Sequence, residues 1–366
     1  MFGNKVYELS LVKDYVSHWG LAEAARELIQ NSLDSNSPFQ YSFIPAAEDG
    51  GWAFELKSEH SRLEPHHLLL GSTSKANDSG AIGSFGEGFK IALLVLTRIG
   101  HPVTIYNNER TWTPMFRMNK NYGTDLLCIE EVIEKRSRTG LTFIVEGLSD
   151  ADRATIERCC LKMQPEVGQT IPTMKGDILL DRPGELYVGS LLISDKHNLK
   201  FGYNVKPEFI SLERDRQTVS DWDLRCLTRD MWYESKRHDE VAQMIYDDVP
   251  DLYYARYSSP ELIKAALMEL FDKRHPGALL AESPSELKRM IEKGMVNTVY
   301  VGSTTHGVIG DYAPMVSRRN ESIRVQTPTE FLTSWANANL SDGTALKKHF
   351  DEQVLTVARG WINQRT

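Results

Sequence analysis

The sequence predicts a protein of the α+β class, whose N-terminal portion combines helices with a mostly antiparallel sheet. Apolar residues recur at helical spacing in residues 21–36, and residues 89–99 form a second apolar helix. Residues 41–59 read as two strands around a Gly-Gly turn, and residues 101–119 alternate as a hairpin. Because helices and antiparallel strand pairs are mixed along one segment, we expect an α/β sandwich.

The other elements of this portion follow from local patterns. Residues 8–20 are predicted to be a helix that is separated from the next helix at Gly20. The remaining elements are a short helix at 66–71, a polar glycine-bearing loop at 72–88, a strand at 140–148 and a helix at 150–163. These elements make residues 1–170 the first predicted domain.

Two smaller portions are predicted to follow. Residues 171–249 contain short strands up to about residue 205 and a helical stretch at 219–249, so we expect a smaller α+β domain. Residues 250–366 form a third, mostly helical portion, in which two helices begin with Ser-Pro, a signal for helix entry. A strand is predicted at 297–303, and residues 327–366 are predicted to be mostly helical.

Composition narrows the functional classes. The chain has 366 residues, a net charge of −8 and a hydrophobic content of 41%, which are values typical of a globular protein. Its four cysteines form no C-x-x-C pair, which argues against a zinc ribbon. The N-terminus lacks an apolar signal segment, and the longest apolar run is too short to span a bilayer. We therefore expect a cytoplasmic protein without a membrane partner, while a local basic patch leaves DNA open as a partner.

The first candidate motif is "ELIQNSLDS", in which Glu27, Asn31 and Asp34 are spaced i, i+4 and i+7. On a helix these residues share one face, opposite the apolar positions. A carboxylate can orient a water for attack on a phosphate, and an amide oxygen is a suitable ligand for Mg²⁺. The alternative is the solvated polar face of an ordinary amphipathic helix.

The second candidate motif is "IGSFGEGFK", which precedes the apolar helix. Gly83, Gly86 and Gly88 allow close approach of the backbone to a ligand, and the free N–H groups of a helix start attract phosphate. The alternative is a tight loop before a core helix. The chain has no G-x-x-x-x-G-K-[ST] sequence, so a P-loop is excluded.

Together, E-x-x-x-N-x-x-D and G-x-x-G-x-G-x-K in this order resemble the GHKL ATPase superfamily of gyrase, heat-shock chaperone, histidine kinase and MutL proteins. The resemblance implies a Bergerat-type nucleotide-binding domain at residues 1–170 and a transducer-like portion at 171–249. It also implies binding and hydrolysis of ATP with Mg²⁺. Compact proteins with this resemblance occur in bacteria and their phages, so we expect a bacterial or phage-encoded protein.

The resemblance assigns roles to individual residues. It implies that Glu27 orients the attacking water and that Asn31 is the metal ligand. Asp34 is implied to support these two residues, with Lys75 as a further contact. Phosphate contacts are implied for the glycine-rich lid and the start of its helix: Gly83, Gly86, Glu87, Gly88, Phe89 and Lys90. The side chain of Lys90 could instead cap the loop.

The segment between the two motifs departs from the family. GHKL proteins carry D-x-G-x-G there, and its aspartate binds the adenine amino group. Here Ser58 stands at the aspartate position, with His60 and Arg62 at the glycine positions. Glu59 is one residue away and could substitute for the missing acid. The family's late-strand threonine is assigned to Thr142, for which an ordinary strand threonine is the alternative.

A residue from the next domain reaches the γ-phosphate in several family members. Arg214 and Arg216 are the candidates for this catalytic role, and the alternative is a pair of surface arginines. Lid closure in the family is often coupled to dimerisation, so we expect a nucleotide-dependent homodimer or an unidentified protein partner. The competing interpretation is a non-hydrolysing nucleotide-binding regulatory module, or a binder of another nucleotide-like ligand.

Overall fold

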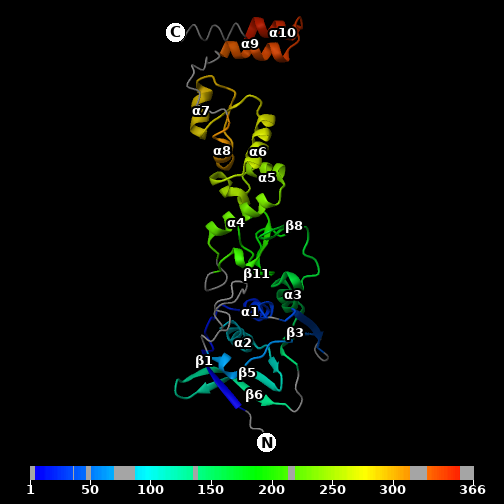
Figure 1. The fold of residues 1–366 in the computed structure, drawn as a ribbon. Coiled ribbons are helices and arrows are strands. Elements are labelled where there is room, and N and C mark those ends of the chain that lie inside the picture. The colour runs from blue at the N-terminus through cyan, green and yellow to red at the C-terminus, as the bar shows by residue number, and fades with distance from the viewer. Residues whose placement is uncertain are drawn as a thin grey trace. The chain divides into compact units, whose positions relative to one another are not determined.

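The computed structural model confirms the α+β class and divides into two compact units, Met1–Ser235 and Lys236–Thr366 (Figure 1). The structure describes residues 5–35, 37–46, 51–69, 87–134, 139–212, 219–313 and 328–354. The first two predicted domains fall mainly in the first unit, although the predicted boundary at 249 lies beyond Ser235. No helix among these residues is both long and apolar enough to cross a membrane.

The first unit is built on a seven-stranded sheet whose neighbouring strands are all antiparallel. Its strand order is β1-β6-β5-β4-β7-β3-β2. The strands are β1 Lys5–Val12, β2 Gln40–Pro45, β3 Trp52–Ser58, β4 Val103–Asn107, β5 Arg110–Asn119, β6 Thr124–Ile133 and β7 Leu141–Leu148. The predicted strands at 41–59, 101–119 and 140–148 are thus confirmed.

Helices cover one face of this sheet. They are α1 Leu21–Leu33, α2 Gly88–Ile99 and α3 Asp150–Arg158, and Figure 1 shows α1 and α2 beside the sheet. Alternate residues of β3, such as Phe54 and Leu56, are buried beneath the helices. The helix α2 is almost wholly apolar and ends at Gly100, whose φ of 89° suits the left-handed cap of a helix.

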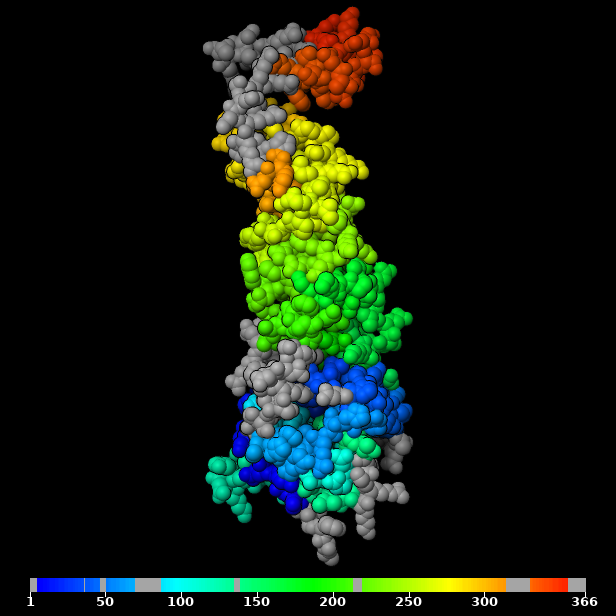
Figure 2. Space-filling view, viewed as in Figure 1, coloured from blue at the N-terminus to red at the C-terminus, as the bar shows by residue number. Residues whose placement is uncertain are grey.

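The predicted helix at residues 8–20 is wrong. Residues Lys5–Val12 form β1, which pairs with β6, and Figure 2 shows the dark blue surface near the N-terminus beside the blue-green surface of β6. Leu9 and Leu11 are both buried and alternate with exposed residues, which is the pattern of a half-buried strand. The partner strand β6 was not predicted, since its buried run lacks simple alternation.

A second, five-stranded sheet completes the first unit and confirms the predicted short strands. Its order is β11-β10-β12-β9-β8, and β10 is parallel to β12. The strands are β8 Thr170–Thr173, β9 Gly176–Leu179, β10 Leu186–Val188, β11 Leu191–Ser194 and β12 Gly202–Val205. The helix α4, Asp221–Glu234, packs on this sheet, where Trp232 Nε1 donates a hydrogen bond of 3.0 Å to Tyr203 Oη.

The second unit is mostly helical, as predicted. Its helices are α5 His238–Tyr246, α6 Glu261–Arg274, α7 Pro284–Glu292, α8 Ser303–Ile309, α9 Pro328–Asn339 and α10 Ala345–His349. The predicted strand at 297–303 shortens to β14, Thr298–Val299, which pairs with β13, Leu279–Leu280. The predicted helical stretch at 219–249 is interrupted where Lys236 has a φ of 59°, a conformation that a helix does not contain.

Candidate functional site

Helix α1 carries the three polar residues of the first motif. The amide of Gly20 donates to Glu23 Oε2 at 2.8 Å, which satisfies a backbone group at the helix start. Glu27 is only 1% exposed, whereas Asn31 and Asp34 are partly exposed near the C-terminal end of the helix. A buried glutamate is rare on an ordinary helix face, so the alternative of a solvated polar face does not describe Glu27.

The side-chain amide of Asn31 is oriented by its own helix. Its Nδ2 donates to the Glu27 carbonyl oxygen at 2.7 Å. Because the nitrogen of the amide is engaged with the helix, the carbonyl oxygen Oδ1 is the atom that Asn31 can offer to a ligand. Mg²⁺ usually keeps several of its water ligands and needs few ligands from the protein. The Oδ1 atom of Asn31 is suited to be such a ligand.

Ser58, at the end of β3, faces α1. It is 7% exposed, and its Oγ lies 3.4 Å from Oγ of Ser32. Glu59 turns away instead, and its carboxylate lies 3.1 Å from Lys57 Nζ. The hydrogen bond and charge of Lys57 lower the pKa of Glu59. Of the two candidates for the missing aspartate, the structure therefore brings Ser58, and not the carboxylate of Glu59, to α1.

Residues at the ends of neighbouring strands contact the loop after Ser58 and hold its backbone in place. Gly140 has a φ of 81°, and a Cβ there would lie 2.6 Å from the Ser58 carbonyl oxygen. Asn107, which is 1% exposed, donates from Nδ2 to the Leu63 carbonyl oxygen at 2.6 Å and accepts from the Leu63 amide at 3.2 Å. Sequence reasoning missed Asn107, although an amide beside a hairpin turn is a common anchor of nearby backbone.

The register of β7 places Thr142 apart from Ser58, and its predicted role stays a prediction. Thr142 pairs with Lys57 and Tyr106, whereas its neighbour Leu141 pairs with Ser58. Because paired residues share a face and successive residues alternate, Thr142 lies on the opposite face of the sheet from Ser58. The structure thus does not bring Thr142 together with α1.

Helix α2 begins at Gly88, after Glu87, and carries the end of the second motif. Phe89 is 9% exposed and belongs to the core, and Lys90 is fully buried. Lys90 Nζ donates to the carbonyl oxygens of His67, at 2.9 Å, and Leu69. These two residues lie in or beside the 3₁₀ helix η1, Pro65–Leu68, so the structure places the Lys90 ammonium on the backbone that leads into residues 72–88.

Burial lowers the pKa of Lys90, while Glu87 opposes that shift. Because Lys90 Nζ donates to two backbone carbonyl oxygens ahead of the glycine-rich segment, the capping alternative for Lys90 matches its position in the structure. The other predicted residues, Lys75, Gly83, Gly86, Arg214 and Arg216, lie outside the described residues and stay predictions.

The described parts of the two motifs converge on one region. Helices α1 and α2 contact each other, and α1 also contacts β3. The packed helices and β3 thus carry a buried acid, an oriented amide oxygen and a buried hydroxyl, and α2 begins at the end of the second motif. Such a set can bind a phosphate group and polarise a water, as phosphoryl transfer requires.

Comparison with known proteins adds one relative. The chain is 26% identical over 220 residues to an uncharacterized protein of Mycoplasma pneumoniae. The match covers 57% of this chain and 89% of the Mycoplasma protein. No family model matches the sequence.

Proposed function

We propose that this protein binds ATP with Mg²⁺ and hydrolyses the γ-phosphate, as do the GHKL ATPases that its motifs resemble. One observation carries the proposal. The two helices that bear the motifs, α1 and α2, pack together on the helical face of an antiparallel sheet, and Ser58 at the end of β3 reaches α1 at Ser32. Motifs that are separated along the sequence thereby become neighbours.

In this proposal Glu27 orients the attacking water. A carboxylate that is 1% exposed is shielded from bulk solvent, and such shielding strengthens its interaction with a bound water. Asn31 Oδ1 binds the metal ion, which neutralises charge on the phosphate oxygens. Asp34, at the C-terminal end of α1, supports this arrangement.

Backbone amides at the start of α2 form the described part of the phosphate site. The N-terminus of a helix attracts anions because its first N–H groups have no partner within the helix. Lys90 takes a different role from a direct phosphate contact, because its ammonium already holds the carbonyl oxygens of His67 and Leu69. It fixes the backbone that precedes the glycine-rich lid.

The test is Mg²⁺-dependent ATP hydrolysis by the wild-type protein and by Glu27→Gln. We expect the variant to lose about a hundredfold in rate or more, because a positioned base contributes roughly that much. ATP should still raise the thermal midpoint of the variant, since binding stabilises the folded state. Glu157→Ala, which removes a carboxylate 2.9 Å from Arg153 on α3, is the matched control and should retain activity. Equal rates in wild type and Glu27→Gln would contradict the proposal.

A second candidate function is the binding of a different nucleotide without turnover. The Ser58 hydroxyl favours this candidate, since it replaces the carboxylate that selects adenine in the family. A thermal-shift series with ATP, ADP, GTP, CTP and UTP distinguishes the two. Preferential stabilisation by ATP together with hydrolysis supports the first function, and stabilisation by another nucleotide without hydrolysis supports the second.

We also propose that nucleotide binding is coupled to self-association or to a protein partner. The coupling follows from the family resemblance, in which lid closure and dimerisation go together. Light scattering after size exclusion, with and without a non-hydrolysable ATP analogue, measures it directly. A mass that stays monomeric with bound analogue would contradict the homodimer and leave the protein partner as the expectation.

A further inference from the structure

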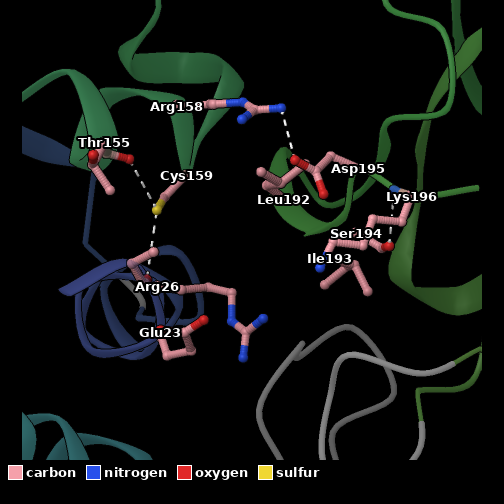
Figure 3. Close-up of a pocket in the computed structure, with 11 residues that line it drawn as sticks. Glu23, Arg26, Thr155, Arg158, Cys159, Leu192, Ile193, Ser194, Asp195 and Lys196 are labelled. Atoms are coloured by element: carbon pink, nitrogen blue, oxygen red, sulfur yellow. Dashed lines mark hydrogen bonds and ion pairs between the residues drawn. The ribbon is translucent and has the colours of Figure 1, made fainter. Parts of the chain in front are cut away.

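A pocket of about 500 Å³ lies between α1, α3 and the end of β11 in the first unit. Figure 3 shows Glu23 and Arg26 on α1, Arg158 at the end of α3 with Cys159 directly after it, and Asp195 on the segment after β11. This volume is within the range of small-molecule sites. Neither Glu27, Asn31 nor Ser58 is among the described residues that line it, so it is separate from the proposed nucleotide site.

Arg26 is the unusual residue of this pocket. Its side chain is 6% exposed, and no described residue forms a hydrogen bond with its Nε or Nη2. A buried guanidinium without an acceptor is costly, because desolvation of the charge and of its N–H donors is uncompensated. A natural protein that keeps such a group usually offers it to a ligand or ordered water.

The carboxylates of the pocket are already engaged elsewhere. Glu23 Oε2 accepts the Gly20 amide at 2.8 Å, and Asp195 Oδ2 lies 2.9 Å from Arg158 Nη2. Neither acid forms an ion pair with Arg26 within the described structure. Because these local acids do not neutralise Arg26, its charge is available to an anion that enters the pocket.

The rest of the lining defines the ligand class. Leu192 and Ile193 supply apolar surface, and Ser194 and Thr155 supply hydroxyl groups. Lys196 adds a cation besides Arg26 and the paired Arg158. Cys159 lies deep in the wall, and burial raises its pKa to about 12, so its thiol stays neutral. A guanidinium beside apolar and hydroxyl surfaces suits an organic molecule that carries an oxyanion.

We propose that this pocket binds a small organic anion, whose carboxylate or phosphate group is held by the positive charge of Arg26 in the pocket wall. The apolar part of the ligand rests on Leu192 and Ile193. This site does not depend on the proposed ATPase activity.

Titration calorimetry tests the site with succinate as the carboxylate probe and glycerol 3-phosphate as the phosphate probe. We expect millimolar or tighter binding of one probe, and Arg26→Met should weaken it about tenfold or more. Arg153→Gln, which removes a cation of α3 outside the lining, should bind as the wild type does. Asn31→Ala should also bind normally, which separates this site from the nucleotide site. The probe that binds identifies the oxyanion.

The stability of Arg26→Met without any probe is an independent readout. Because the variant removes a buried charge whose Nε and Nη2 have no acceptor in the described part of the chain, its thermal midpoint should equal or exceed that of the wild type. If the role of the guanidinium were purely structural, Arg26→Met would instead have a clearly lower thermal midpoint than the wild type. Absence of binding of both probes to a folded wild-type protein, or equal binding to Arg26→Met, would overturn the proposal.

Discussion

The ammonium of Lys90 lies 2.9 Å from the carbonyl oxygen of His67, and this contact ties the first turn of α2 to η1. A second carbonyl, that of Leu69, accepts from the same nitrogen. Both acceptors belong to the backbone, so the interaction fixes the path of the chain between β3 and the glycine-rich segment. The lysine of the second motif therefore acts on its own chain in the absence of nucleotide.

Lys90→Met should destabilise the protein without nucleotide. The variant keeps the apolar stem and leaves two carbonyl oxygens without their donor, which typically costs about 1–3 kcal/mol. Hydrogen exchange should show faster opening at the amides of His67 and Leu69, which donate to Glu64 and His66. Unchanged exchange and stability in the absence of ATP would instead favour a role restricted to bound phosphate.

Gly140→Ala should be more harmful than Gly100→Ala. Both glycines have a positive φ, at 81° and 89°, so alanine is strained at each by roughly 1 kcal/mol or more. Only at Gly140 would the new Cβ meet backbone, at 2.6 Å from the Ser58 carbonyl oxygen. Urea denaturation of both variants measures the difference, and nucleotide affinity should fall only in Gly140→Ala, because Ser58 moves. Equal losses in the two variants would show that the contact with Ser58 is easily relieved.

The stability of the first unit should fall on mild acidification because of His197. Burial lowers the pKa of this imidazole, with Asp221 opposing and Arg225 reinforcing the shift, and its Nε2 has no hydrogen-bond partner among the described residues. Below pH 6.5 the unfolded chain binds the proton more readily, so the free energy of unfolding rises with pH up to about 6.5 and levels off above it.

Urea midpoints between pH 5 and pH 8 measure this dependence. His197→Gln should show a smaller slope than the wild type, by at most about 1.4 kcal/mol per pH unit. An identical pH dependence in both proteins would assign the acid sensitivity to other groups.

Alkylation should distinguish the four cysteines. Burial raises the pKa values of Cys128, Cys159 and Cys160, and that of Cys159 reaches about 12. Since the thiolate is the nucleophile, iodoacetamide at pH 8 should modify the partly exposed Cys226 first. Peptide mass spectrometry of timed samples gives the order, and labelling in urea should make all four reactive. Rapid labelling of Cys159 in the folded protein would mean that the pocket wall opens readily.

Regular patterns made much of the fold predictable. The apolar helix at 89–99 and the hairpin at 101–119 have clear local signals, since their side chains follow the period of one element. The strand β1 escaped prediction because its alternating run is short and ends at Val12, inside the residues 8–20 that were predicted to be a separate helix. Its partner β6 is set by tertiary pairing, which a local pattern does not report.

The candidate site was predictable as a set of motifs, and its geometry required the structure. Spacing placed Glu27 and Asn31 on one helix face, but nothing in the sequence indicated that Glu27 would be 1% exposed. A single step along β7 separates Thr142 from the face that Ser58 occupies, so an error of one residue reverses the direction of a side chain. Arg26, beside the motif glutamate, gave no sequence signal, because only the fold shows that its Nε and Nη2 have no hydrogen-bond partner among the described residues.

The pairing of Lys5 with Glu131 has a consequence for biosynthesis. The strand β1 is translated before β6 and cannot take its place until β6 has been translated, and β6 itself pairs with β5. During that interval the nascent chain displays an unpaired strand with Leu9 and Leu11 exposed, a surface on which nascent-chain aggregation or chaperone binding begins. Pausing of translation between β1 and β6 would prolong this exposure, whereas pausing after β6 would not.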